Sequence, residues 1–218
     1  MKETFRRYPI GIQNFEDLRN NDCVYIDKTA LIYHLTHTNK IYFLSRPRRF
    51  GKSLLVSTLE AYFQGKKDLF CGLAMEELEK DWIKYPILHL DLNTEKYDTP
   101  ESLDRILNDT LAKWEMVYGT APSETSIPLR FKGIVQRACE QSGQRVVILI
   151  DEYDNFTNQL LTAYKDPLYE QVTTKDSFLR TFFKVIKSHS SVRLDNVLSV
   201  YIISLKVVDT RLTKVCVR

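Results

Sequence analysis

The sequence lacks the features that would tie it to a membrane, a disulfide framework or a zinc site. It contains no uninterrupted run of about 18 apolar residues, so no membrane-spanning helix is predicted. Its four cysteines, Cys23, Cys71, Cys139 and Cys216, form no CxxC pair. Because scattered cysteines suit neither a small disulfide scaffold nor a zinc site, they favour a reducing cytoplasm.

The sequence also lacks an excess of charge and any cluster of flexible residues. It has 31 Lys and Arg against 28 Asp and Glu, and this net charge of +3 indicates no particular partner. Its seven Gly and seven Pro form no stretch typical of an interdomain linker, and residues 1–9 do not resemble a secretory signal. With 44% hydrophobic and 11% aromatic residues, the chain can form a core, which excludes disordered and collagen-like classes.

Apolar runs alternate with helical stripes along the chain. The strand predicted at 146–150 is continuously apolar, as is typical of strands buried on both faces of a parallel sheet. Alternating strands and helices predict an α/β fold with a mainly parallel sheet flanked by helices. The predicted strands lie at 41–44, 87–92, 146–150 and 197–203, and the predicted helices at 54–63, 101–118, 156–164 and 176–188.

The segment that joins the first strand to its helix, residues 45–53 (SRPRRFGKS), has the context of a phosphate-binding loop. A turn that leads into a helix N-terminus directs backbone N–H groups at an anion. Gly51 permits close backbone approach, Lys52 is expected to contact the β- and γ-phosphates, and the Ser53 hydroxyl to complete a Mg²⁺ shell. The residues predicted to bind the nucleotide are Arg46, Pro47, Arg48, Arg49, Phe50, Gly51, Lys52 and Ser53.

Two residues of this loop depart from the usual phosphate-loop pattern. Arg46 stands where the consensus has Gly, and Pro47 has no N–H, so the nearest donors to a phosphate are those of residues 50–53. The same loop holds the densest basic cluster of the chain, which leaves nucleic-acid phosphates open as an alternative ligand. No interleaved stacking aromatics accompany that cluster.

An acidic pair, Asp151 and Glu152, follows the strand at 146–150. At the carboxyl end of a parallel strand, such side chains project into the crevice where ligands bind. Asp151 is predicted to hold Mg²⁺ together with Ser53, and Glu152 to polarise the water that attacks the γ-phosphate. The separation of 99 positions between Lys52 and Asp151 leaves room for an additional strand between the two motif strands of the sheet.

Several motifs together resemble the bacterial AAA-ATPase-like family of P-loop NTPases, and the resemblance extends from about residue 8 to about residue 188. They are residues 9–12 (PIGI), Phe15, 25–29 (YIDKT), 46–53 (RPRRFGKS) and 150–154 (IDEYD). The family resemblance implies an additional strand, a catalytic Glu and an N-terminal segment near the nucleotide. Many members carry a C-terminal PD-(D/E)XK nuclease-like domain.

From the residues and the resemblance together we expect a three-layer P-loop fold that binds ATP and Mg²⁺. Lys52 and Glu152 are the expected catalytic residues for hydrolysis of ATP to ADP and phosphate. Two alternatives stay open: a nucleotide-binding switch that hydrolyses ATP weakly, and a nucleic-acid-associated defence or mobile-element component. The sequence indicates no oligomeric state.

The expected organisation is an N-terminal segment at 1–40, a P-loop core at 41–204 and a divergent or truncated tail at 205–218. The tail prediction rests on two departures from the family pattern. Residues 155–157 (NFT) replace a Pro-containing turn, and the predicted strand at 197–203 is not followed by a Thr-Gly-like step.

Several other polar residues are expected to have structural rather than catalytic roles. Asp27 is expected to cap a helix through Leu31, Ile32 and Leu35. His89 is expected to be a hydrogen-bonded strand residue rather than a catalytic one. His34 and His37 are expected on the surface, Asp154 in a solvated turn, and Arg180 on an exposed helix rather than as a charge-stabilising finger.

Overall fold

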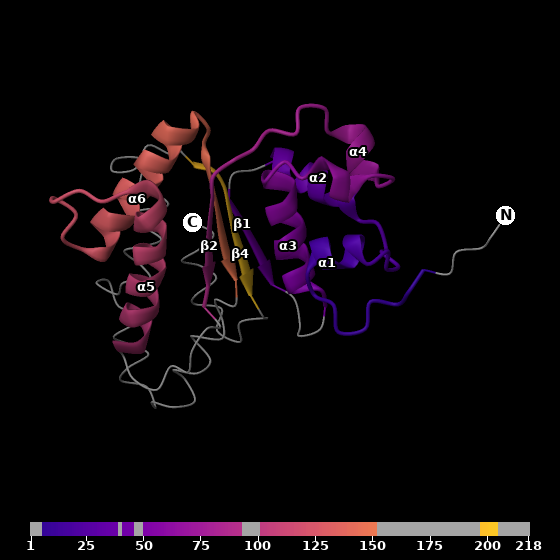
Figure 1. The fold of residues 1–218 in the computed structure, drawn as a ribbon, viewed down its shortest axis with the longest axis horizontal. Helices are drawn as coiled ribbons and strands as arrows, with labels where there is room; N and C mark the ends of the chain where they lie inside the picture. The colour runs from indigo at the N-terminus through magenta and orange to yellow at the C-terminus, as the bar shows by residue number, and fades with distance from the viewer. Residues whose placement is uncertain (1–5, 39–40, 46–49, 93–100, 152–196, 205–218) are drawn as a thin grey trace.

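Four parallel strands form one sheet in the computed structural model, which describes residues 6–38, 41–45, 50–92, 101–151 and 197–204 (Figure 1). The strand order is β1-β4-β3-β2. The strand between β1 and β3 is therefore β4, whereas β2 lies at the edge. The strands are β1 (Ile41–Ser45), β2 (Ile87–Asp91), β3 (Val146–Asp151) and β4 (Val197–Ser204).

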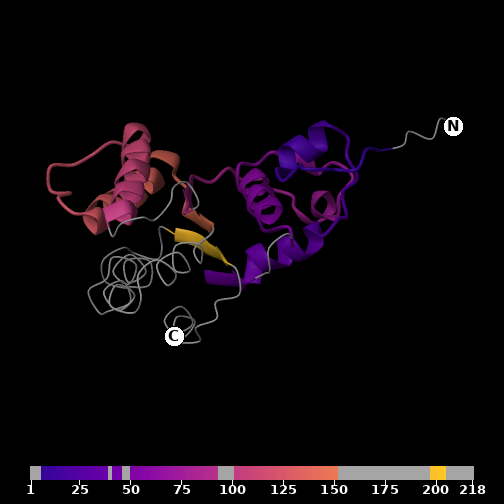
Figure 2. The same ribbon diagram turned by 90° about the horizontal axis from the view of Figure 1, so that it is seen from below.

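Helices lie on both sides of this sheet. Figures 1 and 2 show α1 to α4 on one side and the antiparallel pair α5 and α6 on the other. No described helix is long and apolar enough to cross a membrane. The helices are α1 (Phe15–Asn20), α2 (Thr29–Thr38), α3 (Lys52–Phe63), the 3₁₀ helix η1 (Lys67–Phe70), α4 (Ala74–Leu78), α5 (Glu101–Tyr118) and α6 (Ile127–Ser142).

Most predicted elements within the described residues are confirmed. The helix predicted at 101–118 has those bounds, and the predicted strands overlap β1, β2, β3 and β4. The helix α6 was missed, although Phe131, Ile134, Val135 and Ala138 are buried at helical spacing. The helices predicted at 156–164 and 176–188 and the tail at 205–218 lie outside the described residues.

Side-chain alternation determines which residues of β2 and β3 lie on the α3 side of the sheet. Val147 and Leu149 pack in one apolar cluster with residues of α3, and Ile87 packs against that cluster. Because side chains two residues apart share a face of a strand, Asp151 follows Val147 and Leu149 on this face. By the same rule, His89 and Asp91 follow Ile87.

The parallel register brings the carboxyl ends of all four strands to one edge. Asp91 lies opposite Asp151 in the pairing of β2 with β3, and Ser45 lies opposite Ser204 in the pairing of β1 with β4. A polar residue therefore ends each strand at the edge where ligands of open α/β sheets bind.

The segment before β1 is attached to α3 and α4 by specific contacts. The Phe15 N–H donates to Ser57 Oγ at 2.9 Å, and the Phe15 ring is fully buried. Asp27 Oδ1 accepts from the Thr29 N–H at 2.8 Å, while Asp27 Oδ2 accepts from the Ala74 N–H at 2.7 Å. One carboxylate thus caps the starts of α2 and α4 together, which confirms its predicted capping role.

These hydrogen bonds make stability depend on pH. Burial raises the pKa of Asp27, but the hydrogen bonds from Ala74 and Thr29 outweigh it and lower that pKa below its ordinary 3.8. A lowered folded-state pKa stabilises the fold above the unfolded value, and that stabilisation is lost as pH falls through the folded value. Asp27→Ala should therefore lower the free energy of unfolding by about 1 kcal/mol at pH 7 and by less at pH 3.

Urea denaturation at the two pH values measures this difference. The control is Asp68→Asn, which changes another exposed carboxylate and should alter stability by less than about 0.5 kcal/mol. An equal loss from Asp27→Ala at pH 7 and pH 3 would contradict the pH-dependent role of the carboxylate.

Candidate functional site

The first turn of α3 begins at a glycine in the left-handed conformation. Gly51 has φ 70° and ψ 30°, and its carbonyl accepts from the Leu55 N–H at 3.0 Å. Among the described residues, no atom lies within 4 Å of the position that a Cβ would occupy on Gly51. The backbone conformation, rather than crowding, therefore requires glycine here, and space is open beside the helix N-terminus. A helix N-terminus favours negative charge.

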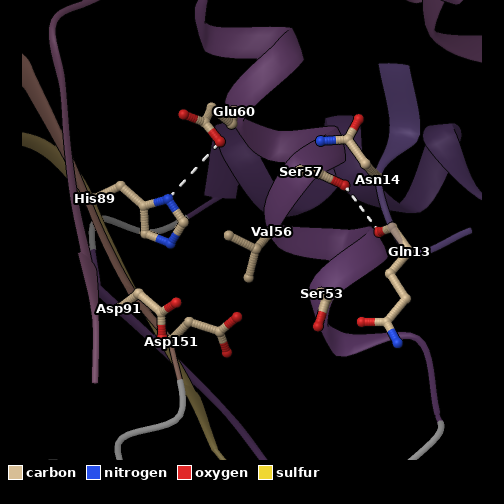
Figure 3. A pocket seen from close by; sticks show the side chains of 9 residues that line it. All are labelled: Gln13, Asn14, Ser53, Val56, Ser57, Glu60, His89, Asp91 and Asp151. Carbon is tan, nitrogen blue, oxygen red and sulfur yellow. Dashed lines mark hydrogen bonds and ion pairs between the residues drawn. The ribbon is translucent and has the colours of Figure 1, made fainter. Parts of the chain in front are cut away.

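Lys52 and Ser53 follow Gly51 in this turn. Lys52 is only 6% exposed, which is rare for lysine because burial of its ammonium group is costly without compensating interactions. Ser53 lines a cavity of about 440 Å³ between α3 and the carboxyl ends of β2 and β3 (Figure 3). The turn thus presents a buried cation and a hydroxyl next to a cavity.

This space, which we call the polar cavity, is lined mostly by polar side chains from four parts of the fold. Ser53, Val56, Ser57 and Glu60 recur at helical spacing along α3 and form one wall, and β2 and β3 form the opposite wall (Figure 3). The full lining is Gln13, Asn14, Ser53, Val56, Ser57, Glu60, His89, Asp91 and Asp151.

Two carboxylates stand together at the strand ends. Asp91 and Asp151 are register partners, and Figure 3 shows both side chains turned into the polar cavity, across from Ser53. Asp151 is 8% exposed. Two like charges in close proximity disfavour each other unless a cation lies nearby. Their oxygen atoms and the Ser53 hydroxyl are hard donors of the kind that Mg²⁺ prefers.

The donor set fits a metal that is only partly held by protein. Within the described residues, no group of three or more His, Cys, Asp or Glu is arranged to hold a metal ion. Mg²⁺ commonly takes one or two carboxylates and completes its shell from phosphates and water. Ser53 and Asp151 therefore suit Mg²⁺ that arrives with a phosphate ligand, and do not suit a closed metal cage.

A His–Glu pair lines the part of the polar cavity that is farther from Ser53 (Figure 3). His89 Nδ1 is 3.8 Å from Glu60 Oε2, and both side chains are about one-third exposed. His89 Nε2 is buried and has no hydrogen-bond partner among the residues that the structure describes. His89 lies in β2, as predicted, but the expected hydrogen bonding is not met at Nε2 within the described part of the chain.

A second space, the apolar cavity, lies on another side of the same helical turn. It measures about 510 Å³ and is lined by Gly51 and Leu54 of the α3 region and by residues before β1. Burial raises the pKa of Tyr25, so its hydroxyl stays neutral in this wall. Four aromatic or aliphatic side chains of the lining are strongly exposed: Tyr8 at 79%, Ile26 at 77%, Leu31 at 68% and Phe50 at 64%.

The structure brings some of the predicted site residues together and leaves others undescribed. Ser53 and Asp151, predicted to share a metal, line the same cavity, and Lys52 precedes Ser53 in the chain. His34 and His37 are exposed on α2, as predicted. The residues outside the described part are Arg46, Pro47, Arg48, Arg49, Glu152, Asp154 and Arg180.

Sequence reasoning missed Asp91 and Glu60 as residues of the cavity. Asp91 ends an apolar strand as Asp151 does, so the same signal was present in both strands. Glu60 lies seven residues after Ser53, and this spacing returns to the same face of a helix. Neither signal predicts that Glu60 on α3 faces Asp91 across one cavity, because that depends on the pairing of β2 with β3 and on the packing of α3 against them.

Gly51→Ala tests the requirement for a left-handed residue at the start of α3. A non-glycine residue in this conformation costs about 1 kcal/mol, which urea denaturation should detect. Calorimetric titration with inorganic triphosphate should also give weaker binding, because the altered turn misplaces the backbone donors.

Gly143→Ala is the matched control. Gly143 has φ 65° and no atom of the described residues within 4 Å of its Cβ position, but it ends α6, on the other side of the sheet (Figure 1). We expect a similar loss of stability and unchanged triphosphate binding. Equal weakening of triphosphate binding by both substitutions would contradict a specific role for Gly51.

Comparison with known proteins gives two matches. A family model described as Predicted AAA-ATPase matches residues 9–209. An uncharacterized protein in the vnfD 5′ region of Azotobacter chroococcum mcd 1 is 36% identical over 151 residues, which cover 68% of this chain and 29% of that protein. The match thus spans less than a third of the relative's length. No solved structure matches the chain.

Proposed function

This chain belongs to the Predicted AAA-ATPase family, and from this premise we propose that it is a three-layer P-loop domain that binds ATP with Mg²⁺ and hydrolyses it. One observation carries the proposal: the apolar cavity and the polar cavity both border the first turn of α3, the apolar cavity at Gly51 and the polar cavity at Ser53. A nucleotide has a matching order of parts, with an aromatic base at one end and a polyphosphate at the other.

The phosphates lie at the N-terminus of α3 in this proposal. Backbone N–H groups of residues 50–53 donate to them, and the Lys52 ammonium contacts the β- and γ-phosphates. The burial of Lys52 and the left-handed Gly51 support this arrangement. Arg46, Pro47, Arg48 and Arg49 complete the loop as nucleotide-binding residues.

Ser53 and Asp151 are the residues that would hold Mg²⁺. Bound Mg²⁺ would neutralise charge on the phosphate oxygens during transfer. The position of both residues on the polar cavity, with Asp91 beside Asp151, supports this assignment. Glu152, the next residue after Asp151, would orient the attacking water.

The base occupies the apolar cavity in this proposal. Apolar residues before β1, including Ile26, form much of its lining, and Phe50 reaches it from the phosphate loop. Their exposed surfaces would be covered by an aromatic base, and burial of apolar area favours binding by about 25 cal/mol per Å². The segment before β1 would therefore contribute to nucleotide affinity.

Lys52→Ala should weaken ATP binding by about 10- to 100-fold. This range corresponds to the loss of a charged hydrogen bond worth about 1.5–3 kcal/mol. Calorimetric titration of the purified chain with ATP and Mg²⁺ measures it. Lys67→Ala, which removes an exposed lysine from η1, is the control and should leave the affinity unchanged. Equal affinity in wild type and Lys52→Ala would contradict the phosphate-loop assignment.

Glu152→Gln should lower the rate of ATP hydrolysis by about 100-fold or more while ATP still binds, because the amide cannot accept a proton from water. Phosphate release at saturating ATP and Mg²⁺ measures the rate. Glu77→Gln, an exposed substitution on α4, is the matched control. ATP binding with equal background rates in wild type and Glu152→Gln would identify a nucleotide-binding switch in place of an ATPase.

A further inference from the structure

We propose that Gln13 contacts the γ-phosphate of ATP and makes the chain prefer ATP over ADP. Its side-chain amide donates a hydrogen bond to an oxygen of that phosphate, so the segment before β1 distinguishes the two nucleotides. The inference rests on the proposed function, because it adds a contact to the same bound nucleotide. It goes beyond that function, since Gln13 belongs neither to the phosphate loop nor to the acidic strand end.

The order of the two cavities determines which phosphate meets the polar cavity. The apolar cavity borders the first turn of α3 at Gly51, and the polar cavity borders it at Ser53. A polyphosphate that extends from a base in the apolar cavity therefore ends at the polar cavity. ADP lacks the last phosphate of this chain. A side chain of the polar cavity that contacts the last phosphate thus favours ATP and contributes nothing to ADP binding.

Gln13 lines the polar cavity beside the first turn of α3. Figure 3 shows its side chain pointing toward Ser53, whereas Asp91 and Asp151 stand on the opposite wall. A phosphate that shares Mg²⁺ with Ser53 and Asp151 therefore has Gln13 as a neighbour on the side away from the strand ends.

Contacts with α3 fix the backbone from which this side chain extends. Ser57 Oγ accepts from the Phe15 N–H at 2.9 Å and lies 3.5 Å from the Gln13 carbonyl oxygen. Because Phe15 is fully buried, this attachment is anchored in the core. Ser57 follows Ser53 by four residues, and residues at this spacing are neighbours on one face of a helix. The backbone of Gln13 is thus held one helical turn from Ser53.

The side chain of Gln13 is available to a ligand, whereas those beside it have structural roles. Asn14 Oδ1 accepts from the Asp17 N–H at 3.2 Å and caps α1, and the Ser57 hydroxyl holds the Phe15 N–H. Gln13 is exposed, and its side chain has no hydrogen-bond partner among the residues that the structure describes. Its amide offers two N–H donors. It can therefore donate to a phosphate without giving up a contact within the fold.

The charge of the polar cavity makes such a donor useful. Glu60, Asp91 and Asp151 line the cavity, and their carboxylates disfavour the additional negative charge of a γ-phosphate. Mg²⁺ offsets this charge on the wall of Asp151. Hydrogen bonds from an N–H group to an anion are stronger than those between neutral groups. Gln13 supplies such a donor on the wall that faces Asp91 and Asp151.

The test compares the affinities for ADP and for AMP-PNP, a non-hydrolysable analogue of ATP, by calorimetric titration with Mg²⁺. Wild type should bind AMP-PNP at least about tenfold more tightly than ADP. Gln13→Ala should weaken AMP-PNP binding by about tenfold and leave the ADP affinity within twofold. Gln13→Glu should weaken AMP-PNP binding further, because it replaces the N–H donors with a carboxylate of the same shape.

Gln136→Ala and Gln136→Glu are the matched controls. Gln136 is an exposed glutamine on α6, on the other side of the sheet (Figure 1), and both substitutions should leave both affinities unchanged. Urea denaturation of Gln13→Ala should give the midpoint of wild type, because the removed side chain makes no hydrogen bond within the described part of the fold. This measurement separates a contact with the nucleotide from a role in folding.

The outcomes distinguish a failure of this inference from a failure of the proposed function. If wild type prefers AMP-PNP and both Gln13 variants keep that preference, the contact is wrong and the nucleotide site stands. Equal affinities of wild type for AMP-PNP and ADP, or an equal loss of both affinities in Gln13→Ala, would also overturn the contact. If wild type binds neither nucleotide, the proposed function fails, and the role of Gln13 fails with it.

Discussion

The parallel pairing of β2 with β3 is the constraint on which the candidate site depends. It sets Asp91 opposite Asp151 and turns His89 to the face that α3 covers. A shift of one residue in this register would move the β2 side chains to the other face of the sheet. The positions of Asp91 and His89 in the polar cavity therefore both follow from this strand pairing.

Helix α3 lines both the polar cavity at the strand ends and the apolar cavity. Its first turn borders the polar cavity through Ser53 and the apolar cavity through Gly51, and its later turns carry both Glu60 and the core residues Leu59 and Phe63. One face of α3 thus packs in the apolar core, and another lines the polar cavity. The segment before β1, attached by Phe15 and Asp27, forms the outer wall of the apolar cavity.

The sequence predicted those parts of the fold that depend on local pattern. Continuous apolar runs identified the strands, and the Gly51-Lys52-Ser53 and Asp151-Glu152 motifs identified two sides of the site. Asp91 and Glu60 were not predicted as residues of the cavity, because their positions there follow from strand register and helix packing between distant segments. His89 in an apolar strand is ambiguous until the opposite residue on α3 is known.

The central claim is that one nucleotide spans both cavities through the first turn of α3. The most direct measurement is calorimetric titration of the wild-type chain with ATP, adenosine and inorganic triphosphate, each with Mg²⁺. The account predicts that ATP binds at least about tenfold more tightly than either part, a difference of about 1.4 kcal/mol. Adenosine or triphosphate binding as tightly as ATP would contradict it.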